Sequence, residues 1–153
     1  MINLSIETND ALKQVEVLFD ELDSALDADE ILDEAATVML SRTMRRFRAQ
    51  TTPDGHGWKT SKSAQIRMSG GYTWSNGKKV TGGHTLFATG KLFQSFDIID
   101  GGKGERRIVN TAPYAIYLNY TNNGQWQFLG AGAQDIQLMV NIVNDRIEKA
   151  LRK

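Results

Sequence analysis

The sequence predicts an α+β fold in which two N-terminal helices and a long C-terminal helix cover a small antiparallel sheet. Three observations predict it. Three segments place apolar residues at three- and four-residue steps, short runs between them are typical of strands, and glycine-rich turns separate these runs. The 153 residues are enough for one domain with a hydrophobic core, but they are too few for two domains that each have a core of ordinary size. We therefore expect a single domain over residues 1–153.

The first two elements are a short strand and a helix. Ile2, Leu4 and Ile6 alternate with polar residues, which predicts a strand with one buried face. Thr8 or Asn9 can then cap a helix. The apolar stripe of this helix consists of Leu12, Val15, Leu18, Phe19, Leu22 and Leu26. Its opposite face is acidic and carries Glu16, Asp20, Glu21 and Asp23.

A second helix is predicted through Phe47, with Asp27 or Asp29 as its cap. Its first turn is acidic and its last turns are rich in arginine, which suits the helix dipole at both ends. The sequence Thr51-Thr52-Pro53-Asp54-Gly55 ends the helix, because proline disfavours helix in the residue before it and Asp-Gly turns the chain.

Residues 57–84 are polar and rich in glycine, serine and lysine, which predicts a long flexible loop. Within it, Asn76-Gly77 can form the turn of a hairpin. A loop of this length in a small domain is usually functional or disordered. We expect it to reach a neighbouring protein and to become ordered on contact.

The second half of the chain alternates short elements and ends in a clear helix. Leu86 to Phe96 has the spacing of a short helix, and strands are expected over Ser95–Asp100 and Arg106–Asn110. Tyr114 to Tyr120 is apolar, and its type is not decided by the pattern. Apolar residues at helical spacing predict the last helix from about Ala133 to Arg152.

The charges are unevenly distributed, although 18 basic residues balance 18 acidic ones. Residues 1–40 hold eleven acidic residues and one base, whereas residues 41–107 hold thirteen bases and four acidic residues. Such a chain can attract its own copies head to tail, acidic face on basic face. The other interpretation is that both are ordinary solvated surfaces.

No pattern in the sequence is typical of catalysis or of metal binding. The chain has no cysteine, and His56 and His84 lie outside any metal-ligand spacing. Asp54 could act with His56 as an acid–base pair, but Pro-Asp-Gly is first of all a turn sequence. No run is long and apolar enough for a transmembrane helix, and residues 1–7 are unlike a secretory signal. We therefore expect no enzyme, no cofactor, no metal and no membrane partner.

A cluster of basic residues suggests nucleic acid as an alternative partner. Arginines from Arg42 to Arg48 are followed by lysines, with Trp58, Tyr72 and Trp74 among them. Basic residues interleaved with aromatic ones can hold a phosphate backbone and stack on bases. The overall charge is zero and no known nucleic-acid motif is present, so a basic face that meets acidic helices of a neighbouring subunit is the simpler interpretation.

Four short motifs resemble the virion morphogenesis, or tail completion, family of tailed phages, which is known best from Mu-like phages with contractile tails. The first is Phe47 followed by Pro53-Asp54-Gly55-His56-Gly57-Trp58, and the second is the Leu-x-x-Thr-Gly-x-Leu-x-x-Ser pattern that begins at Leu86. The third is Tyr114-Ala115 with Gly124 downstream, and the fourth is Phe128-Leu129-Gly130 before the last helix. Their order and spacing over about residues 30–152 carry the resemblance.

This resemblance implies a structural subunit at the head–tail junction or tail of the virion, made in the host cytoplasm. It would assemble as a ring of about six or twelve copies, contact neighbouring neck and tail proteins, and let DNA pass through. A tail terminator that caps the tail tube, a DNA-binding accessory protein and a small hydrolase remain the alternatives.

A closed ring needs heterologous contacts, in which one surface binds a different surface of the next copy. The acidic helices and the basic region supply such a pair. The residues expected on the acidic side are Asp20, Glu21, Asp23 and Asp33. The residues expected on the other side are Arg45, Arg46, Arg48 and Lys62, with Tyr72 and Trp74 from the long loop.

Overall fold

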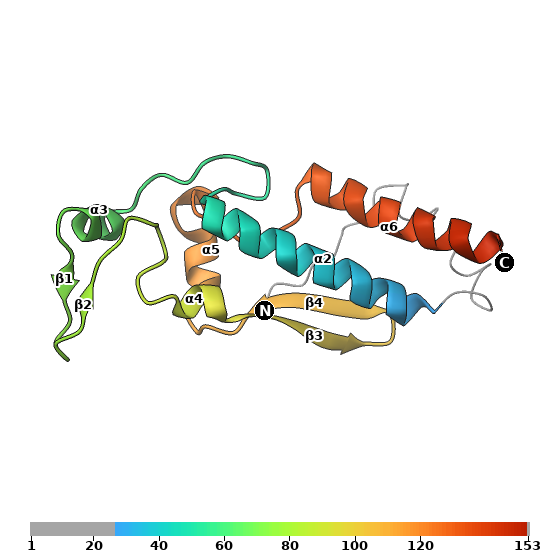
Figure 1. Ribbon diagram of the computed structural model, residues 1–153, viewed down its shortest axis with the longest axis horizontal. Coiled ribbons are helices and arrows are strands. Elements are labelled where there is room, and N and C mark those ends of the chain that lie inside the picture. The colour runs from blue at the N-terminus through green and yellow to red at the C-terminus, as the bar shows by residue number, and fades with distance from the viewer. Residues whose placement is uncertain (1–26, 153) are drawn as a thin grey trace.

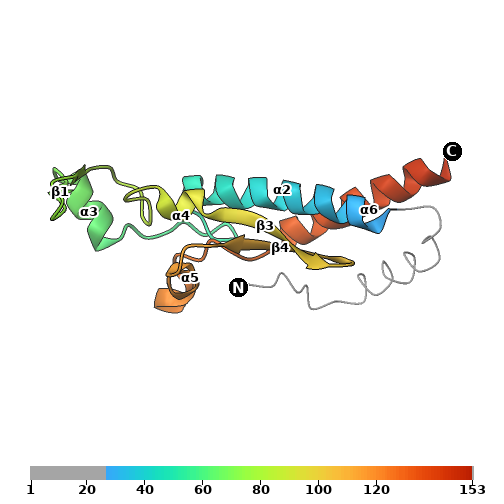
Figure 2. The ribbon, with the colours of Figure 1, turned by 90° about the horizontal axis from the view of Figure 1, so that it is seen from below.

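The computed structural model describes residues 27–152, so the predicted strand at 2–6 and the predicted helix before Asp27 lie outside the described residues. Figures 1 and 2 show an elongated arrangement of helices beside two small hairpins. The elements in chain order are α2 (Ala28–Ala49), α3 (Lys62–Met68), β1 (Tyr72–Thr73), β2 (Lys79–Val80), α4 (Lys91–Gln94), β3 (Phe96–Gly102), β4 (Glu105–Asn110), α5 (Ala115–Gly124) and α6 (Ala133–Leu151). The α+β prediction, with a helix on the N-terminal side and a long C-terminal helix, is confirmed.

Helix α2 begins and ends with caps that its sequence encodes. The Asp27 carboxylate accepts hydrogen bonds from the backbone N–H groups of Asp29 and Glu30, which confirms Asp27 as the N-cap. At the other end Gln50 adopts the left-handed conformation, with φ of 58°, and its N–H donates back to the last turn. The chain therefore turns sharply away from α2 just before Pro53.

The larger hairpin and the last helix both pack against α2. Strands β3 and β4 are antiparallel, with Phe96 opposite Asn110 and Ile98 opposite Ile108. Helix α2 lies across both strands, and α6 runs beside α2 in the opposite direction (Figure 1). The predicted strands at 95–100 and 106–110 are confirmed within one or two residues.

The region predicted as one long loop contains a helix and a hairpin. Helix α3 begins after Ser61, whose hydroxyl accepts a hydrogen bond from the Ala64 N–H. Strands β1 and β2 pair across the predicted Asn76-Gly77 turn. Together α3, β1 and β2 form a distal lobe, at the end of the molecule farthest from the last turns of α6 (Figures 1 and 2). A helix of seven residues in a polar segment leaves only a weak pattern, so the sequence prediction missed it.

Two further segments bear on the sequence prediction. The first is shorter than predicted, and the second had been left undecided. The helix expected over Leu86 to Phe96 is reduced to the four residues of α4, because Leu86 is left-handed with φ of 60° and interrupts any helix there. The undecided segment at 114–120 forms α5. Helix α5 is kinked, since Thr121, Asn122 and Asn123 all leave helical geometry.

The core is a cluster of aromatic rings around Phe47, which is fully buried. The ring centroid of Trp58 lies 5.2 Å away in an edge-to-face arrangement, so this contact fixes the start of the segment at 57–84 to α2. Further rings lie 5.6 to 6.2 Å from Phe47, namely those of Phe87, Phe93, Phe96 and Phe128. The cluster joins α2, α4, β3 and the segment before α6.

We expect Phe47→Ala to lower the free energy of unfolding by about 3–5 kcal/mol, because it removes the centre of this cluster and leaves a cavity. Denaturant unfolding followed by tryptophan fluorescence measures the change. Ile116→Ala is the control, since that side chain is half exposed and its loss should change stability by less than about 0.5 kcal/mol. Equal losses in both variants would show that Phe47 does not hold the core.

Candidate functional site

A buried ion pair connects the end of α2 to the start of α6. Arg42 donates to the Asp135 carboxylate at 2.6 Å, and Arg46 donates to its other oxygen. The Gly132 N–H donates to the same group at 2.9 Å. Burial raises the pKa of Asp135, but the Gly132 N–H and the two guanidinium groups more than offset this and hold it below its usual value. The two helices are thereby fixed to each other at this end.

Other ion pairs gather near the beginning of α2. Arg106 on β4 contacts the carboxylates of Asp29, Asp33 and Asp100. Arg146 on α6 contacts those of Glu30 and Glu34. These carboxylates are largely exposed, so each pair contributes little to stability. Their effect is to neutralise the acidic first turns of α2 within the chain.

The opposite end of the molecule carries basic side chains without such partners. Within residues 27–152, no carboxylate lies within ion-pair distance of a group of exposed cations that consists of Arg45, Lys59, Lys62, Lys78, Lys79 and Lys91. Arg48 lies over the Phe93 ring at 4.7 Å, a cation–π contact. The charge of this end is therefore positive and directed outwards.

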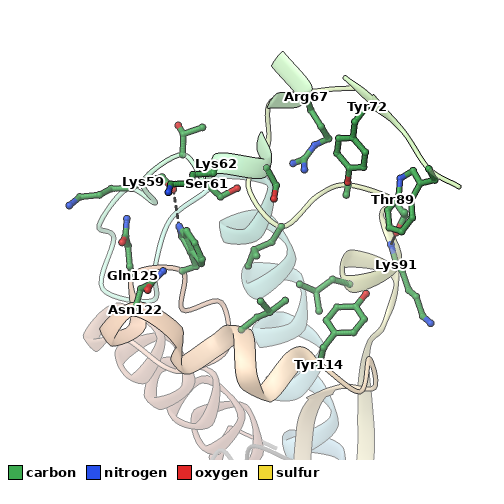
Figure 3. Close-up of a pocket in the computed structure, with 18 residues that line it drawn as sticks. Lys59, Ser61, Lys62, Arg67, Tyr72, Thr89, Lys91, Tyr114, Asn122 and Gln125 are labelled. Carbon is green, nitrogen blue, oxygen red and sulfur yellow. Dashed lines mark hydrogen bonds between the residues drawn. The ribbon is translucent and has the colours of Figure 1, made fainter. Parts of the chain in front are cut away.

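A half-open pocket of about 750 Å³ separates the distal lobe from α4 and α5 (Figure 3). We call it the cationic pocket. Its cations are Lys59, Lys62, Arg67 and Lys91, and no aspartate or glutamate of the described chain lines it. Its remaining surface is mostly apolar and aromatic, and includes Tyr72, Trp74, Leu86, Leu92, Tyr114, Leu118 and Trp126. Figure 3 shows Arg67 and Tyr72 on one side of the pocket and Tyr114 on the other.

The pocket walls are held by hydrogen bonds between segments distant in sequence. The Trp126 indole N–H donates to the Lys59 carbonyl at 2.8 Å. The side-chain amide of Gln50 makes two hydrogen bonds with the backbone of Thr85. Its NH₂ group donates to the Thr85 carbonyl, and its oxygen accepts from the Thr85 N–H at 2.6 Å. Arg67 is buried and donates to the carbonyls of Gly82 and His84. The distal lobe is thus tied to α2 and to the segment after α5.

Helix α5 presents an exposed apolar face beside this pocket. Tyr117 is 71% exposed, Tyr120 61% and Ile116 50%. Exposed apolar groups that lie together mark surfaces that contact other molecules. A second apolar group lies on the distal lobe and comprises Ile66, Met68 and Trp74.

Comparison with known proteins places the chain in a family. The model of the phage virion morphogenesis family matches residues 10–115, which is more than half of the chain. The chain belongs to the phage virion morphogenesis family. No curated protein and no solved structure matches it. The resemblance carried by the Phe47, Pro53–Trp58 and Leu86–Ser95 motifs is thereby confirmed, and the virion morphogenesis protein is expected to have a structural role.

The motifs of this virion morphogenesis protein serve the core and the pocket walls. The Phe47 and Trp58 rings contact each other edge to face, and Leu92 is buried in the same core cluster. The Thr89 hydroxyl accepts a hydrogen bond from the Lys91 N–H at 3.3 Å, although the N-cap of α4 is the left-handed Gly90 and not Thr89. Gly132, just beyond the Phe-Leu-Gly motif, lies so close to Pro53 that a Cβ would come within 2.3 Å of the Pro53 carbonyl oxygen.

The residues predicted to form the interface fall into three groups. Lys62, Tyr72 and Trp74 are brought together in the cationic pocket, and the Tyr72 and Trp74 rings lie 5.9 Å apart. Arg45 and Arg48 are exposed near the end of α2. Asp33 and Arg46 have partners inside the chain, Arg106 and Asp135 respectively. Asp20, Glu21 and Asp23 lie outside the described residues.

Several residues of these surfaces were missed by the sequence prediction. Asp135 was predicted only to lie at the start of the last helix, and its pairing with Arg42 and Arg46 was missed because these residues lie 93 and 89 positions earlier in the sequence. Lys91 and Tyr114 gave no such signal, since their place in the pocket depends on how α4 and α5 pack. Arg67 was one basic residue among many, and nothing in the pattern indicated its burial.

His56 and His84 are exposed and lie on separate turns. Within residues 27–152 no group of three or more histidine, aspartate or glutamate side chains is placed to hold a metal ion. Among the described helices, none has the length and apolar character needed to cross a bilayer.

We expect Asp135→Asn to lower the free energy of unfolding by about 2–4 kcal/mol at pH 7, because it leaves two partly buried guanidinium groups without their counter-charge. The folded-state pKa of Asp135 is lowered, so the ionised carboxylate stabilises the fold above its ordinary value of 3.8, and this contribution is lost as the pH falls through the folded-state pKa. The difference between wild type and variant should therefore shrink in acid.

Urea unfolding at a series of pH values measures this difference. Glu34→Gln is the matched control, because Glu34 forms an exposed pair with Arg146 and its loss should cost at most about 1 kcal/mol. If the difference in the free energy of unfolding between wild type and Asp135→Asn stayed constant from pH 7 into acid, the ionised Asp135 carboxylate would not be the source of the stabilisation.

Proposed function

We propose that this protein is a tail completion, or head–tail joining, subunit that assembles with copies of itself as a ring between the head connector and the tail. Membership of the phage virion morphogenesis family supports a structural role in building the virion. We propose in addition the position in the neck, the assembly into a ring and the contacts with neighbouring proteins.

The observation that carries the proposal is the separation of charge along the molecule. The first turns of α2 are acidic, and most of their carboxylates are paired within the chain. The other end bears the cationic pocket, and no described carboxylate lines it. Surfaces that differ between the two ends favour a heterologous contact, which generates a ring when the rotation closes.

Exposed apolar groups at the same end support contact with other proteins. Tyr117 and Tyr120 on α5 and Trp74 on the distal lobe are all more than two-fifths exposed. Aromatic side chains in such positions are typical of interface centres, where they bury a large area at low cost in conformational entropy. The cationic rim around them would direct the approach of an acidic partner.

We expect the purified protein to form rings of about six or twelve copies at low salt and to dissociate as salt increases. The Debye length falls from about 10 Å at 0.1 M salt to about 3 Å at 1 M, which weakens contacts between exposed charges. Light scattering during size-exclusion chromatography measures the mass. A monomer at every protein and salt concentration would contradict a ring that forms without other virion components.

A DNA-binding accessory role is the second candidate, and the cationic pocket with its neighbouring Tyr72 and Trp74 rings favours it. This role predicts that fluorescently labelled duplex DNA binds the monomer, with an affinity that falls steeply as salt increases. Fluorescence anisotropy at two salt concentrations tests it. A head–tail joining ring predicts instead that self-association occurs without DNA and that Trp74→Ala leaves duplex binding unchanged.

A further inference from the structure

The cationic pocket requires an occupant with two chemical properties. Three exposed lysines line it together with Arg67, which is buried and bonds backbone carbonyls, and the described chain contributes no carboxylate, so an acidic occupant is complementary in charge. Leu86, Leu92, Leu118 and Trp126 form apolar surface in the same pocket, so the occupant must also bring apolar side chains. An acidic amphipathic segment fits both requirements better than a phosphate backbone, which offers charge but no aliphatic groups.

Residues 8–26 of this chain have both properties. Their apolar residues follow a helical spacing, from Leu12 to Leu26, and the opposite face is acidic. Residues 1–26 contain six acidic residues and only one base, Lys13. The segment is therefore complementary to the pocket in charge and in apolar character.

The place where this segment joins the described chain decides which copy provides it. It joins at Asp27, the N-cap of α2, whereas the pocket is lined by residues of α3, α4 and α5, elements that lie at the other end of α2 in Figure 1. Helix α2 has 22 residues and so spans about 33 Å. A helix of about 18 residues spans about 27 Å, so one starting at Asp27 could not place its stripe in the pocket of its own chain. A second copy, aligned head to tail, can do so.

We infer that the acidic amphipathic segment, residues 8–26, of one copy docks into the cationic pocket of the next copy. This rests on the proposed ring and names its contact. Each subunit gives one segment and receives one, so the contact is heterologous and repeats around the ring. It also explains why α2's own carboxylates can be paired internally while the pocket keeps its positive charge.

Disulfide trapping tests the contact in the full chain, which has no cysteine of its own. Ser63→Cys places a thiol in the pocket, and Ala11→Cys or Ala25→Cys places one on the apolar side of the segment. Oxidation of each double variant should give a ladder of covalently linked chains. The control combines the same segment cysteines with Lys103→Cys, in the exposed β3–β4 turn, and should give no ladder. Bonds only within one chain, or no bonds in any pocket variant, would overturn the inference.

Charge reversal tests the same contact without cross-linking. Lys62→Glu with Lys91→Glu reverses two of the four pocket cations, and Asp20→Lys with Glu21→Lys reverses two acidic residues of the segment. Each variant alone should associate at least about tenfold more weakly than wild type, and an equimolar mixture of the two should recover association. Lys103→Glu with Lys149→Glu, which makes the same change in net charge elsewhere, should associate as wild type does.

The outcomes separate this inference from the proposed function. Rings of wild-type mass that form in both reversed variants, with unchanged thermal unfolding, would overturn segment docking and leave the head–tail joining role standing. Absence of the protein from purified virions would instead remove the proposed function, whatever the trapping shows.

Discussion

Phe47 lies where the end of α2 meets four other parts of the chain, and the rest of the structure depends on this contact. Its ring is fully buried among Trp58, α4, β3 and the segment before α6. Three residues later Gln50 turns the chain away and bonds Thr85 in the segment that returns from the distal lobe. The same junction therefore fixes both connections to the distal lobe, and with them the walls of the cationic pocket. A change in this cluster would alter the core and the proposed contact surface together.

The ion pairs divide the charges of the chain into two groups. The pairs of Asp135 with the α2 arginines fix α6 to α2, whereas those of Arg106 and Arg146 neutralise the acidic first turns of α2. They leave the described chain with a positive end, while the compensating negative charge lies largely in residues 1–26. Because the net charge is zero, such a molecule can associate with its copies without strong overall repulsion. The internal pairs neutralise charge within the fold, and the exposed cations of the cationic pocket are the charges available to the proposed contact.

The sequence predicted what local patterns determine and missed what packing determines. Helix α2, its Asp27 cap, the β3–β4 hairpin and α6 all follow from capping residues and apolar spacing. Helix α3 is short and polar, and the left-handed Leu86 breaks an otherwise helical pattern, so neither could be read from periodicity. Within the candidate site, Lys62, Tyr72 and Trp74 were identified from composition, but their meeting with Lys91 and Tyr114 depends on tertiary contacts. Arg46 illustrates the limit most clearly, because its partner Asp135 lies 89 residues away in the sequence.

The most direct test of a head–tail joining role is electron cryo-microscopy of the neck of purified virions from a phage that carries this protein. The fold of α2, α6 and the β3–β4 hairpin should fit a ring of density between the head connector and the tail, with the cationic pocket of each copy facing the next. Density for this fold elsewhere in the particle, or virions that are complete without the protein, would contradict that role.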